Sequence, residues 1–319
     1  MGNSDLSPLV AARADVLAYY SPYYFLRQLA GERQQELFGT GAAGRWAQAE
    51  GAEIFHSRAS PASTEVQLLL KQLAWDSDYF GTPMYRLFTG LFTAQATTDE
   101  LIQAAQGLRQ QLANRHSAFY AFGVVPTEDI RLVQALTGAG WRLVETRLTY
   151  FRDELPAFDY PRFPVRVAAE GEAAHIGRVA AAARNIYDRF HADGWFGEAR
   201  ADAYLARYAE NTVLGQLAAT VLVPNVPDLL VDAFLAISDL QEDAALGTKL
   251  SRVLLTAVGP ANRGWHVKLV AETVHRAQAL GHQAVLMTTQ ATNHAVVRTC
   301  EKLGFRLGST SHVLACHSR

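Results

Sequence analysis

One stretch in the second half of the chain combines a strand, a basic turn and a helix in an order that suits anion binding. The apolar run Val253–Val258 predicts a buried strand, and Gly259-Pro260 ends it. Arg263-Gly264 then forms a basic turn into a helix that we predict to end near Leu280. The first N–H groups of a helix lack intrahelical partners and lie at the positive end of its dipole, so this turn predicts a phosphate site.

The strand before the turn offers a second kind of contact. Leu255, Thr256, Ala257 and Val258 come directly before the break. Their N–H and C=O groups could therefore pair with an extended molecule lying beside them, as an added strand does. Coenzyme A has both a pyrophosphate and an extended, amide-containing arm. The two features together predict a site for it.

The elements that position these groups resemble a known superfamily. Val258-x-Pro260-x-x-Arg263-Gly264 is followed by the helix, by a predicted strand at Ala284–Thr289, and by Asn293 twelve positions before Phe305. This order resembles the GCN5-related N-acetyltransferases. Two further segments, Asp188–Asp193 and Trp75–Gly81, resemble the TDP-fucosamine acetyltransferase branch and its sugar-amine relatives. The resemblance covers residues from about 66 to 319.

The resemblance implies an acetyl-CoA-dependent N-acetyltransferase in which a small amine attacks the thioester directly. The acceptor could be an amino-deoxy sugar nucleotide. A homodimer is one state that the resemblance allows, and no metal is implied. The residues that it places on acetyl-CoA are Leu255, Thr256, Ala257, Val258, Arg263, Gly264, Trp265, His266, Val267, Lys268, Leu269, Asn293 and Val297.

The phosphate turn departs from the family pattern, which is Arg/Gln-x-x-Gly-x-Gly/Ala. His266 and Lys268 stand at the two positions that should be small. On one interpretation His266 turns outward and Lys268 adds a charge-assisted contact to the phosphates. On the other, the loop no longer accepts the cofactor, and the chain is an inactive pseudo-acetyltransferase that binds acyl-CoA or a partner protein. We expect binding to be retained, because the strand, the break, the arginine and the first glycine are present.

Cys300 stands where the family has a tyrosine that protonates the departing thiolate. It follows Asn293 by seven residues, about two helical turns, so both lie on one helix face. A thiol suits this proton transfer by its ordinary pKa, but a cysteine is too short to reach as far as a tyrosine. A free cysteine is more often a small buried core residue, and we expect that role here. Asn293 is also predicted to cap its own helix.

The acceptor side is predicted in the irregular segment Asp188–Asp193. His191 is the candidate that takes a proton from the acceptor ammonium, directly or through water, with Asp193 beside it. Ligand-binding groups gather on such loops. The alternative is that Arg189 and Asp193 only pin the loop by an ion pair.

A short internal sequence repeat predicts two related domains. Gly140–Thr146 (GWRLVET) is similar to Gly304–Thr310 (GFRLGST) at an offset of 304 − 140 = 164 residues, and each opens a strand after a short helix. We therefore predict an α/β class with a mixed sheet and tandem domains resembling the superfamily. Only the second half has the Arg-Gly turn, so the first domain is predicted to be degenerate. The predicted parts are a helical extension over 1–60, a degenerate domain over 61–155 and an acetyl-CoA-binding domain over 164–319.

An aromatic cluster marks the N-terminal extension. Tyr19, Tyr20, Tyr23, Tyr24 and Phe25 surround Ser21-Pro22. Such a cluster could be a ligand platform, but we expect packing that pins the extension to the domain. The glycine-rich run Thr40–Gly44 is predicted to be a loop.

Composition excludes several classes of protein. With 49% hydrophobic and 19% charged residues, the chain is globular, and a net charge of −2 gives no reason to expect nucleic-acid binding. Two cysteines and ten scattered histidines offer neither a disulfide framework nor metal-ligand spacing. No apolar run is long enough to span a membrane, and the N-terminus does not resemble a secretory signal. Cytoplasmic residence is therefore expected.

Overall fold

The structure, a computed structural model, describes residues 6–29, 31–32, 34, 39–58, 63–240 and 247–318. The chain forms two compact units, one of residues 1–146 with 310–319 and one of residues 147–309. The predicted division into 1–60, 61–155 and 164–319 stays a prediction about folding domains. Each unit is described by itself below.

The second unit is built on a mixed sheet with the strand order β6-β7-β8-β9-β10-β5. Only β9 and β10 pair in parallel among these neighbours. Its strands are β6 (Val165–Val167), β7 (Thr220–Pro224), β8 (Ala233–Ser238), β9 (Leu250–Val258), β10 (Ala284–Gln290) and β5 (Arg142–Arg152), which enters this sheet from Arg147 onward. The predicted α/β class with a mixed sheet is confirmed.

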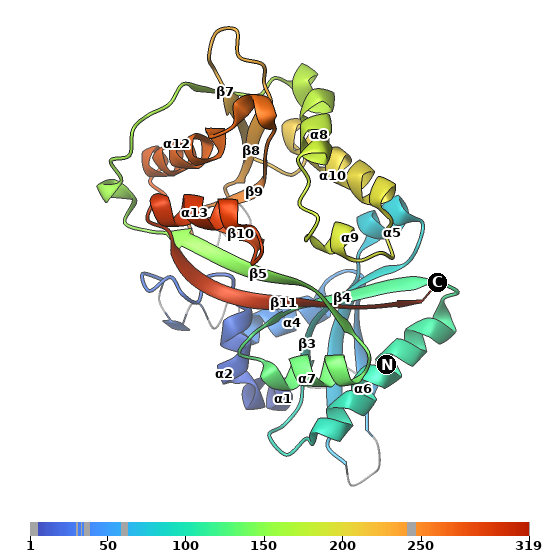
Figure 1. Ribbon diagram of the computed structural model, residues 1–319. Coiled ribbons are helices and arrows are strands. Elements are labelled where there is room, and N and C mark those ends of the chain that lie inside the picture. The colour runs from blue at the N-terminus through green and yellow to red at the C-terminus, as the bar shows by residue number, and fades with distance from the viewer. Residues whose placement is uncertain are drawn as a thin grey trace. The chain divides into compact units, whose positions relative to one another are not determined.

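Helices cover both faces of this sheet, as Figure 1 shows. Strand β8 explains why, because its side chains alternate: Leu235 and Ile237 join one core, and Phe234 and Ala236 join the other. The first core lies under α12 and α13, and the second lies under α8 and α10. The helices are α8 (Ala173–Ala182), α9 (Arg189–Ala192), α10 (Glu198–Val213), α12 (Trp265–Ala279) and α13 (His294–Lys302).

The sequence from Ala173 to Tyr187 has a helical pattern, but helix α8 is shorter than this pattern. It ends at Ala182, and the Asn185 side chain accepts a hydrogen bond from the Tyr187 N–H. An asparagine that bonds to the backbone two residues on competes with helix formation. Asp188 then starts the short helix α9 by accepting from the N–H groups of Phe190 and His191.

Within the first unit the strand order is β1-β2-β3-β4-β11. Here too one neighbouring pair, β3 and β4, is parallel. The strands are β1 (Ala52–Ser57), β2 (Val66–Gln72), β3 (Met84–Leu91), β4 (Phe119–Pro126) and β11 (Arg306–Ser318), which pairs with β4 from Ser311 onward. The helices are α1 (Ser7–Ala12), α2 (Ala14–Leu17), α4 (Thr40–Gln48), α5 (Ala74–Phe80), α6 (Thr98–Arg115) and α7 (Ile130–Gly138), with a short 3-10 turn η1 (Ala18–Tyr20).

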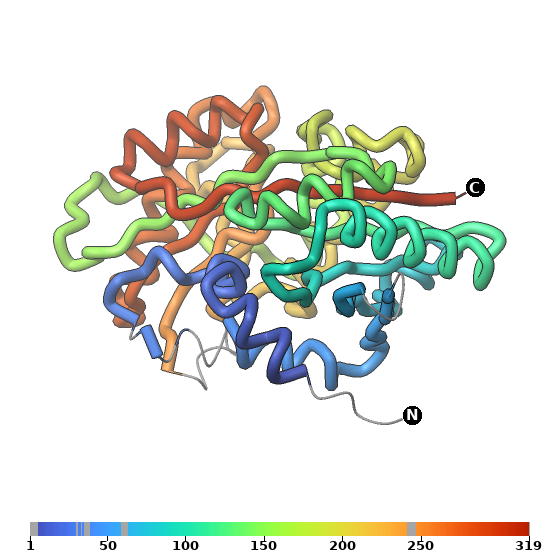
Figure 2. Tube along the Cα trace, turned by 90° about the horizontal axis from the view of Figure 1, so that it is seen from below, coloured from blue at the N-terminus to red at the C-terminus, as the bar shows by residue number. Residues whose placement is uncertain are grey.

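The N-terminal helices form one of the two layers on this sheet. Leu17 and Ala43 pack with Leu69 and Leu91, while α6 and α7 cover the opposite core. Figure 2 shows α1, α2 and α4 in blue and the long helix α6 in teal. The loop predicted at Thr40–Gly44 is wrong, because these residues begin α4. Packing of the apolar face of α4 outweighs the low helix propensity of its glycines.

Candidate functional site

The parallel strands β9 and β10 pair over only part of their length. Their register runs from Leu250–Ala284 to Val253–Met287. The pairing of β9 with β8 continues to Val258, but its register shifts opposite Ala236–Ile237 and leaves Leu254 as an extra residue. A bulge of this kind bends a strand. One edge of residues 254–258 therefore lacks a β10 partner.

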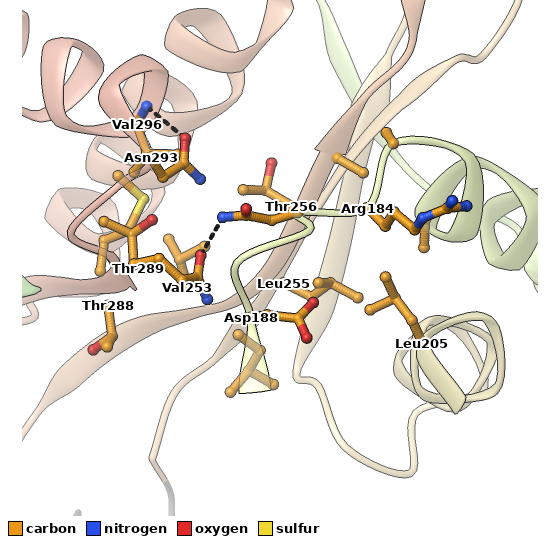
Figure 3. Close-up of a pocket in the computed structure, with 17 residues that line it drawn as sticks. Arg184, Asp188, Leu205, Val253, Leu255, Thr256, Thr288, Thr289, Asn293 and Val296 are labelled. Carbon is orange, nitrogen blue, oxygen red and sulfur yellow. Dashed lines mark hydrogen bonds between the residues drawn. The ribbon is translucent and has the colours of Figure 1, made fainter. Parts of the chain in front are cut away.

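A cavity of about 180 Å³ occupies the space beyond the last β9–β10 pair. Strands β9 and β10, the start of α13, and the segment after α8 contribute its walls (Figure 3). We call this cavity the cleft. Its polar lining consists of Arg184, Asn185, Asp188, Thr256, Thr288, Thr289, Gln290 and Asn293.

The turn after β9 is held by two residues that the sequence did not single out. The Asp232 carboxylate accepts from the Ala261 N–H at 2.9 Å, and Asn262 Oδ1 accepts from the Asp232 N–H at 2.9 Å. Asn262 also donates to the Leu230 carbonyl at 2.9 Å. A Cβ on Gly259 would lie 2.1 Å from an Asp232 oxygen, so glycine is required there. Nothing local in the sequence marks Asp232, because it lies directly before β8 and 29 residues before Ala261.

The N-terminus of α12 has the features of an anion site. Gly264 precedes the helix with φ +86°, and no side chain caps the helix. The first turn contains no acidic residue, and Arg263 is exposed beside it. An added Cβ on Gly264 would meet no atom within 4 Å, so the glycine is needed for its backbone angle rather than for space.

His266 does not turn outward, so the predicted orientation of this side chain is wrong. Its Nδ1–H donates to Thr299 Oγ1 at 2.9 Å, because the Thr299 hydroxyl itself donates to the Ala295 carbonyl. Burial lowers the pKa of His266 to about 4, so the ring is neutral near pH 7. The Lys268 ammonium lies 4.5 Å from the centre of the Trp265 ring, a cation–π contact.

Asn293 has the predicted capping geometry. Its Oδ1 accepts from the Val296 N–H at 3.3 Å, and the residue also lines the cleft. Cys300 has no exposed surface and packs in the core under α13. Burial raises the pKa of its thiol to about 12, which makes it a weak proton donor.

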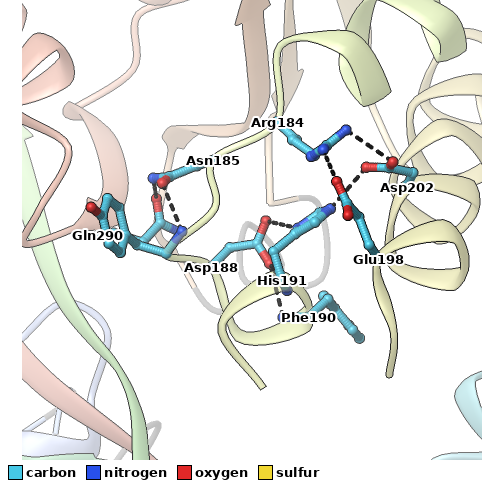
Figure 4. A network of polar contacts seen from close by, with 9 residues as sticks. Arg184, Asn185, Asp188, Phe190, His191, Glu198, Asp202 and Gln290 are labelled. Carbon is cyan, nitrogen blue, oxygen red and sulfur yellow. Dashed lines mark hydrogen bonds and ion pairs between the residues drawn. The ribbon is translucent and has the colours of Figure 1, made fainter. Parts of the chain in front are cut away.

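The acceptor-side network differs from the predicted one (Figure 4). His191 Nδ1 lies 2.8 Å from Asp188 Oδ2, and its Nε2 lies 3.1 Å from Asp202 Oδ1. Arg184 pairs with Asp202 at 2.9 Å and also with Glu198. Because carboxylates engage both ring nitrogens, His191 has no free nitrogen that could take a proton from a substrate amine. Asp188 instead carries the network to the cleft wall.

Two more amides connect the walls of the cleft. Asn185 Nδ2 donates to Gln290 Oε1 at 2.7 Å, which ties the segment after α8 to the end of β10. Asp193 is buried and accepts from the Trp195 N–H at 3.2 Å. It lines a separate hollow of about 260 Å³ rather than the cleft.

The structure brings together only part of the predicted cofactor set. Leu255, Thr256, Ala257 and Asn293 line the cleft. Arg263 and Gly264 are exposed, Trp265 and Leu269 are buried, and Val258, His266, Val267, Lys268 and Val297 are half-buried. Among the described residues, no cluster of histidine, cysteine or acidic side chains could hold a metal ion. No helix in that part of the chain is long and apolar enough to cross a membrane.

Several solved structures share this architecture with the chain. A GCN5-related N-acetyltransferase from Sphaerobacter thermophilus is 10% identical, with a TM-score of 0.58 over 98% of this chain and 93% of that chain. A GCN5-related glucosamine N-acetyltransferase region of a fungal multi-domain GH3 β-N-acetylglucosaminidase is 14% identical, with a TM-score of 0.57 over 99% of this chain and 37% of that one. The chain has the GCN5-related N-acetyltransferase fold.

A functionally unknown conserved protein from Staphylococcus epidermidis is also similar in fold to this chain, with 11% identity and a TM-score of 0.51 over 82% of this chain and 94% of that one. No family model and no curated protein sequence matches the chain. At these identities the likeness concerns the fold alone. The finer resemblance to the TDP-fucosamine branch stays a prediction.

Proposed function

We propose that the second unit is an acetyl-CoA-dependent N-acetyltransferase that acts on a small amine. One observation carries this proposal: the open edge of β9 leads through a braced turn to the uncapped N-terminus of α12. A site for an extended amide chain therefore continues into a site for phosphate. The GCN5-related fold typically binds acyl-CoA, which supports the same assignment.

The donor contacts follow from this geometry. The N–H groups of residues 264–268 and the Arg263 guanidinium would bind the pyrophosphate, since an uncapped helix N-terminus and a cation both attract anions. The free edge of Leu255–Val258 would pair with the pantetheine amides. Asn293, at the start of α13, would then lie beside the thioester.

The acceptor would enter against the polar wall of the cleft. Asp188 supplies a carboxylate that can attract an ammonium, and Asn185 and Gln290 add hydrogen-bonding amides. Within the amines, we propose an amino-deoxy sugar, free or nucleotide-linked, because its hydroxyl groups would match this lining. The similar fungal region, a glucosamine N-acetyltransferase region, supports that class.

The reaction needs few side chains. The amine first loses a proton to water or to Asp188, and its lone pair then attacks the thioester carbonyl. Backbone N–H groups at the β9 edge would stabilise the oxyanion. The carbon–sulfur bond breaks, and the thiolate takes up one proton while the nitrogen releases another. With Cys300 buried, water rather than this thiol would return the proton.

Binding and turnover test the proposal separately. Calorimetry should show that acetyl-CoA binds, and that Arg263→Ala weakens binding by about 1–3 kcal/mol, the range for a lost charge-assisted contact. Arg178→Ala, an exposed arginine on α8, is the matched control and should change nothing. Thiol release with a panel of amino sugars and other amines then measures turnover. Failure of acetyl-CoA to bind the unaltered chain would refute the proposal.

A specific observation also favours a second candidate, a pseudo-acetyltransferase that binds acyl-CoA or a partner protein without transfer. Neither predicted proton-transfer residue is positioned to act, because Cys300 is buried and both nitrogens of His191 are engaged. Tight acetyl-CoA binding without thiol release over the whole amine panel would decide for this candidate.

A further inference from the structure

The centre of the first unit repeats the architecture that makes the cleft of the second. Strands β3 and β4 pair in parallel from Met84–Tyr120 to Leu87–Gly123 and not beyond. Asp129 caps α7 by accepting from the Leu132 N–H at 3.3 Å, as Asn293 caps α13. The offset is 293 − 129 = 164, the same as that of the glycine pair in the internal sequence repeat.

A different occupant lies at this place in the first unit. Asp129 is 1% exposed, and its carboxylate faces the N-terminal segment of the same chain. Arg13 Nη2 lies 2.5 Å from Asp129 Oδ2, and the Tyr20 hydroxyl donates to the same oxygen at 2.7 Å. Arg13 is itself 5% exposed, so the ion pair is almost completely removed from water.

Aromatic rings complete the surroundings of both side chains. The Arg13 guanidinium lies 4.1 Å from the centre of the Phe92 ring, and the Tyr20 ring lies 5.5 Å from that of Phe88. Phe88 and Phe92 follow Leu87, the last residue of β3 in parallel register with β4. η1 also lies against β4, so the segment contacts both strands of the parallel pair.

The chemistry of the two sites differs in one respect. A neutral asparagine stands at the cap position in the second unit, and an aspartate stands there in the first. A buried carboxylate is costly unless a cation or several donors accompany it. The first unit supplies a planar guanidinium and a phenol, which match a carboxylate flanked by aromatic rings. Burial and the Asp129 carboxylate raise the pKa of Tyr20, so its hydroxyl stays a donor.

We propose that Asp129, Phe88 and Phe92 form a binding site for a guanidinium and a phenol in the first unit, and that Arg13 and Tyr20 of the same chain occupy it. The N-terminal segment is therefore an intramolecular ligand that fills the counterpart of the cleft. The aromatic cluster is predicted to pin the extension to its domain, and this site is a specific point at which the extension is held.

Chemical rescue tests the guanidinium site in the full chain. Arg13→Ala should lower the Tm of the first unit by roughly 6–20 °C, the scale for breaking a buried ion pair in a unit of this size. Ethylguanidinium at a few millimolar should restore part of that loss, and ethylammonium should restore less. Arg115→Ala, which breaks an exposed pair with Glu53, is the control and should shift Tm by less than about 3 °C, with no rescue. Equal effects of the two cations on Arg13→Ala would overturn the proposal.

Hydrogen exchange on the unaltered chain gives a second test if Arg13→Ala does not fold. The Leu17 N–H, which donates to the Arg13 carbonyl at 2.8 Å, should exchange as slowly as the amides of β3. Asp129→Asn should speed its exchange by at least about tenfold. Exchange in the unaltered chain at the rate of a free peptide would show that the segment is not a bound ligand.

Discussion

Gly264 and Gly281 stand at the two ends of α12 and form a natural matched pair. Both have a positive φ, +86° and +67°, and an added Cβ would meet no atom within 4 Å at either position. Replacement by alanine therefore introduces no clash in either case. The cost is that of forcing an L-residue into the left-handed region, about 1–2 kcal/mol. We expect Gly264→Ala and Gly281→Ala to destabilise the chain by similar amounts.

The two variants should differ in ligand binding. Gly264 sets the direction of the N–H groups that would bind the pyrophosphate, whereas Gly281 follows the other end of the helix. If the turn in Gly264→Ala moves to relieve this backbone cost, its N–H groups shift and binding should weaken by about 1–2 kcal/mol. The acetyl-CoA affinity of Gly264→Ala should therefore fall by about 5- to 30-fold. Gly281→Ala should bind normally.

Urea unfolding gives the stability change, and calorimetry gives the affinity. Gly44→Ala adds a further control, because Gly44 lies inside α4 with open space around it and should gain about 0.5–1 kcal/mol. Equal acetyl-CoA affinity in Gly264→Ala and Gly281→Ala, with the expected stability loss in both, would refute the placement of the phosphates at α12.

Three further predictions follow from single side chains. Cys300→Ala should keep turnover within about twofold and cost on the order of 1 kcal/mol of stability, because the thiol is buried in the core; a loss of 10²-fold in rate at unchanged Tm would show instead that it is the acid. His191→Ala should lower turnover more than acetyl-CoA affinity, because it loosens Asp188 at the cleft wall, and a loss of donor affinity at normal saturated turnover would contradict this. The pKa of His266 is about 4 in the folded chain and 6.5 in the unfolded one, so its neutral form stabilises the fold above pH 6.5. This contribution, about 3 kcal/mol at most, should be lost as the pH falls from 6.5 to 4, and urea titrations of His266→Gln should show a flatter dependence.

Much of the local structure was accessible from pattern alone. The run Leu255–Val258, the break at Gly259-Pro260 and the cap at Asn293 are determined by short-range preferences, which act within a few residues. The elements that they predict are present as β9, the turn and α13. The helix α4 was missed, because its glycines oppose helix formation locally and its apolar face is buried only by tertiary packing against the sheet and the other N-terminal helices.

The candidate site was accessible only in part. The sequence indicated the segment Asp188–Asp193 and placed Asp193 beside His191, but in the structure Asp188 and Asp202 engage the two ring nitrogens of His191. Asp232 and Asn262 brace the phosphate turn across 30 residues, and no local signal connects them. Arg13 and Asp129 are 116 residues apart and are both buried, so their pairing is visible only in the folded chain.

The sequence by itself determined where the strands, the turn and the helix cap lie between Val253 and Asn293, and that an arginine and a glycine precede α12. Those properties depend on backbone preferences and on apolar periodicity, which are local. The tertiary structure decided which polar groups meet. It placed Cys300 in the core, turned His266 inward onto Thr299, and filled the first unit's counterpart of the cleft with Arg13 and Tyr20. Such outcomes depend on which side chains lose water together, and that is fixed only when distant segments pack.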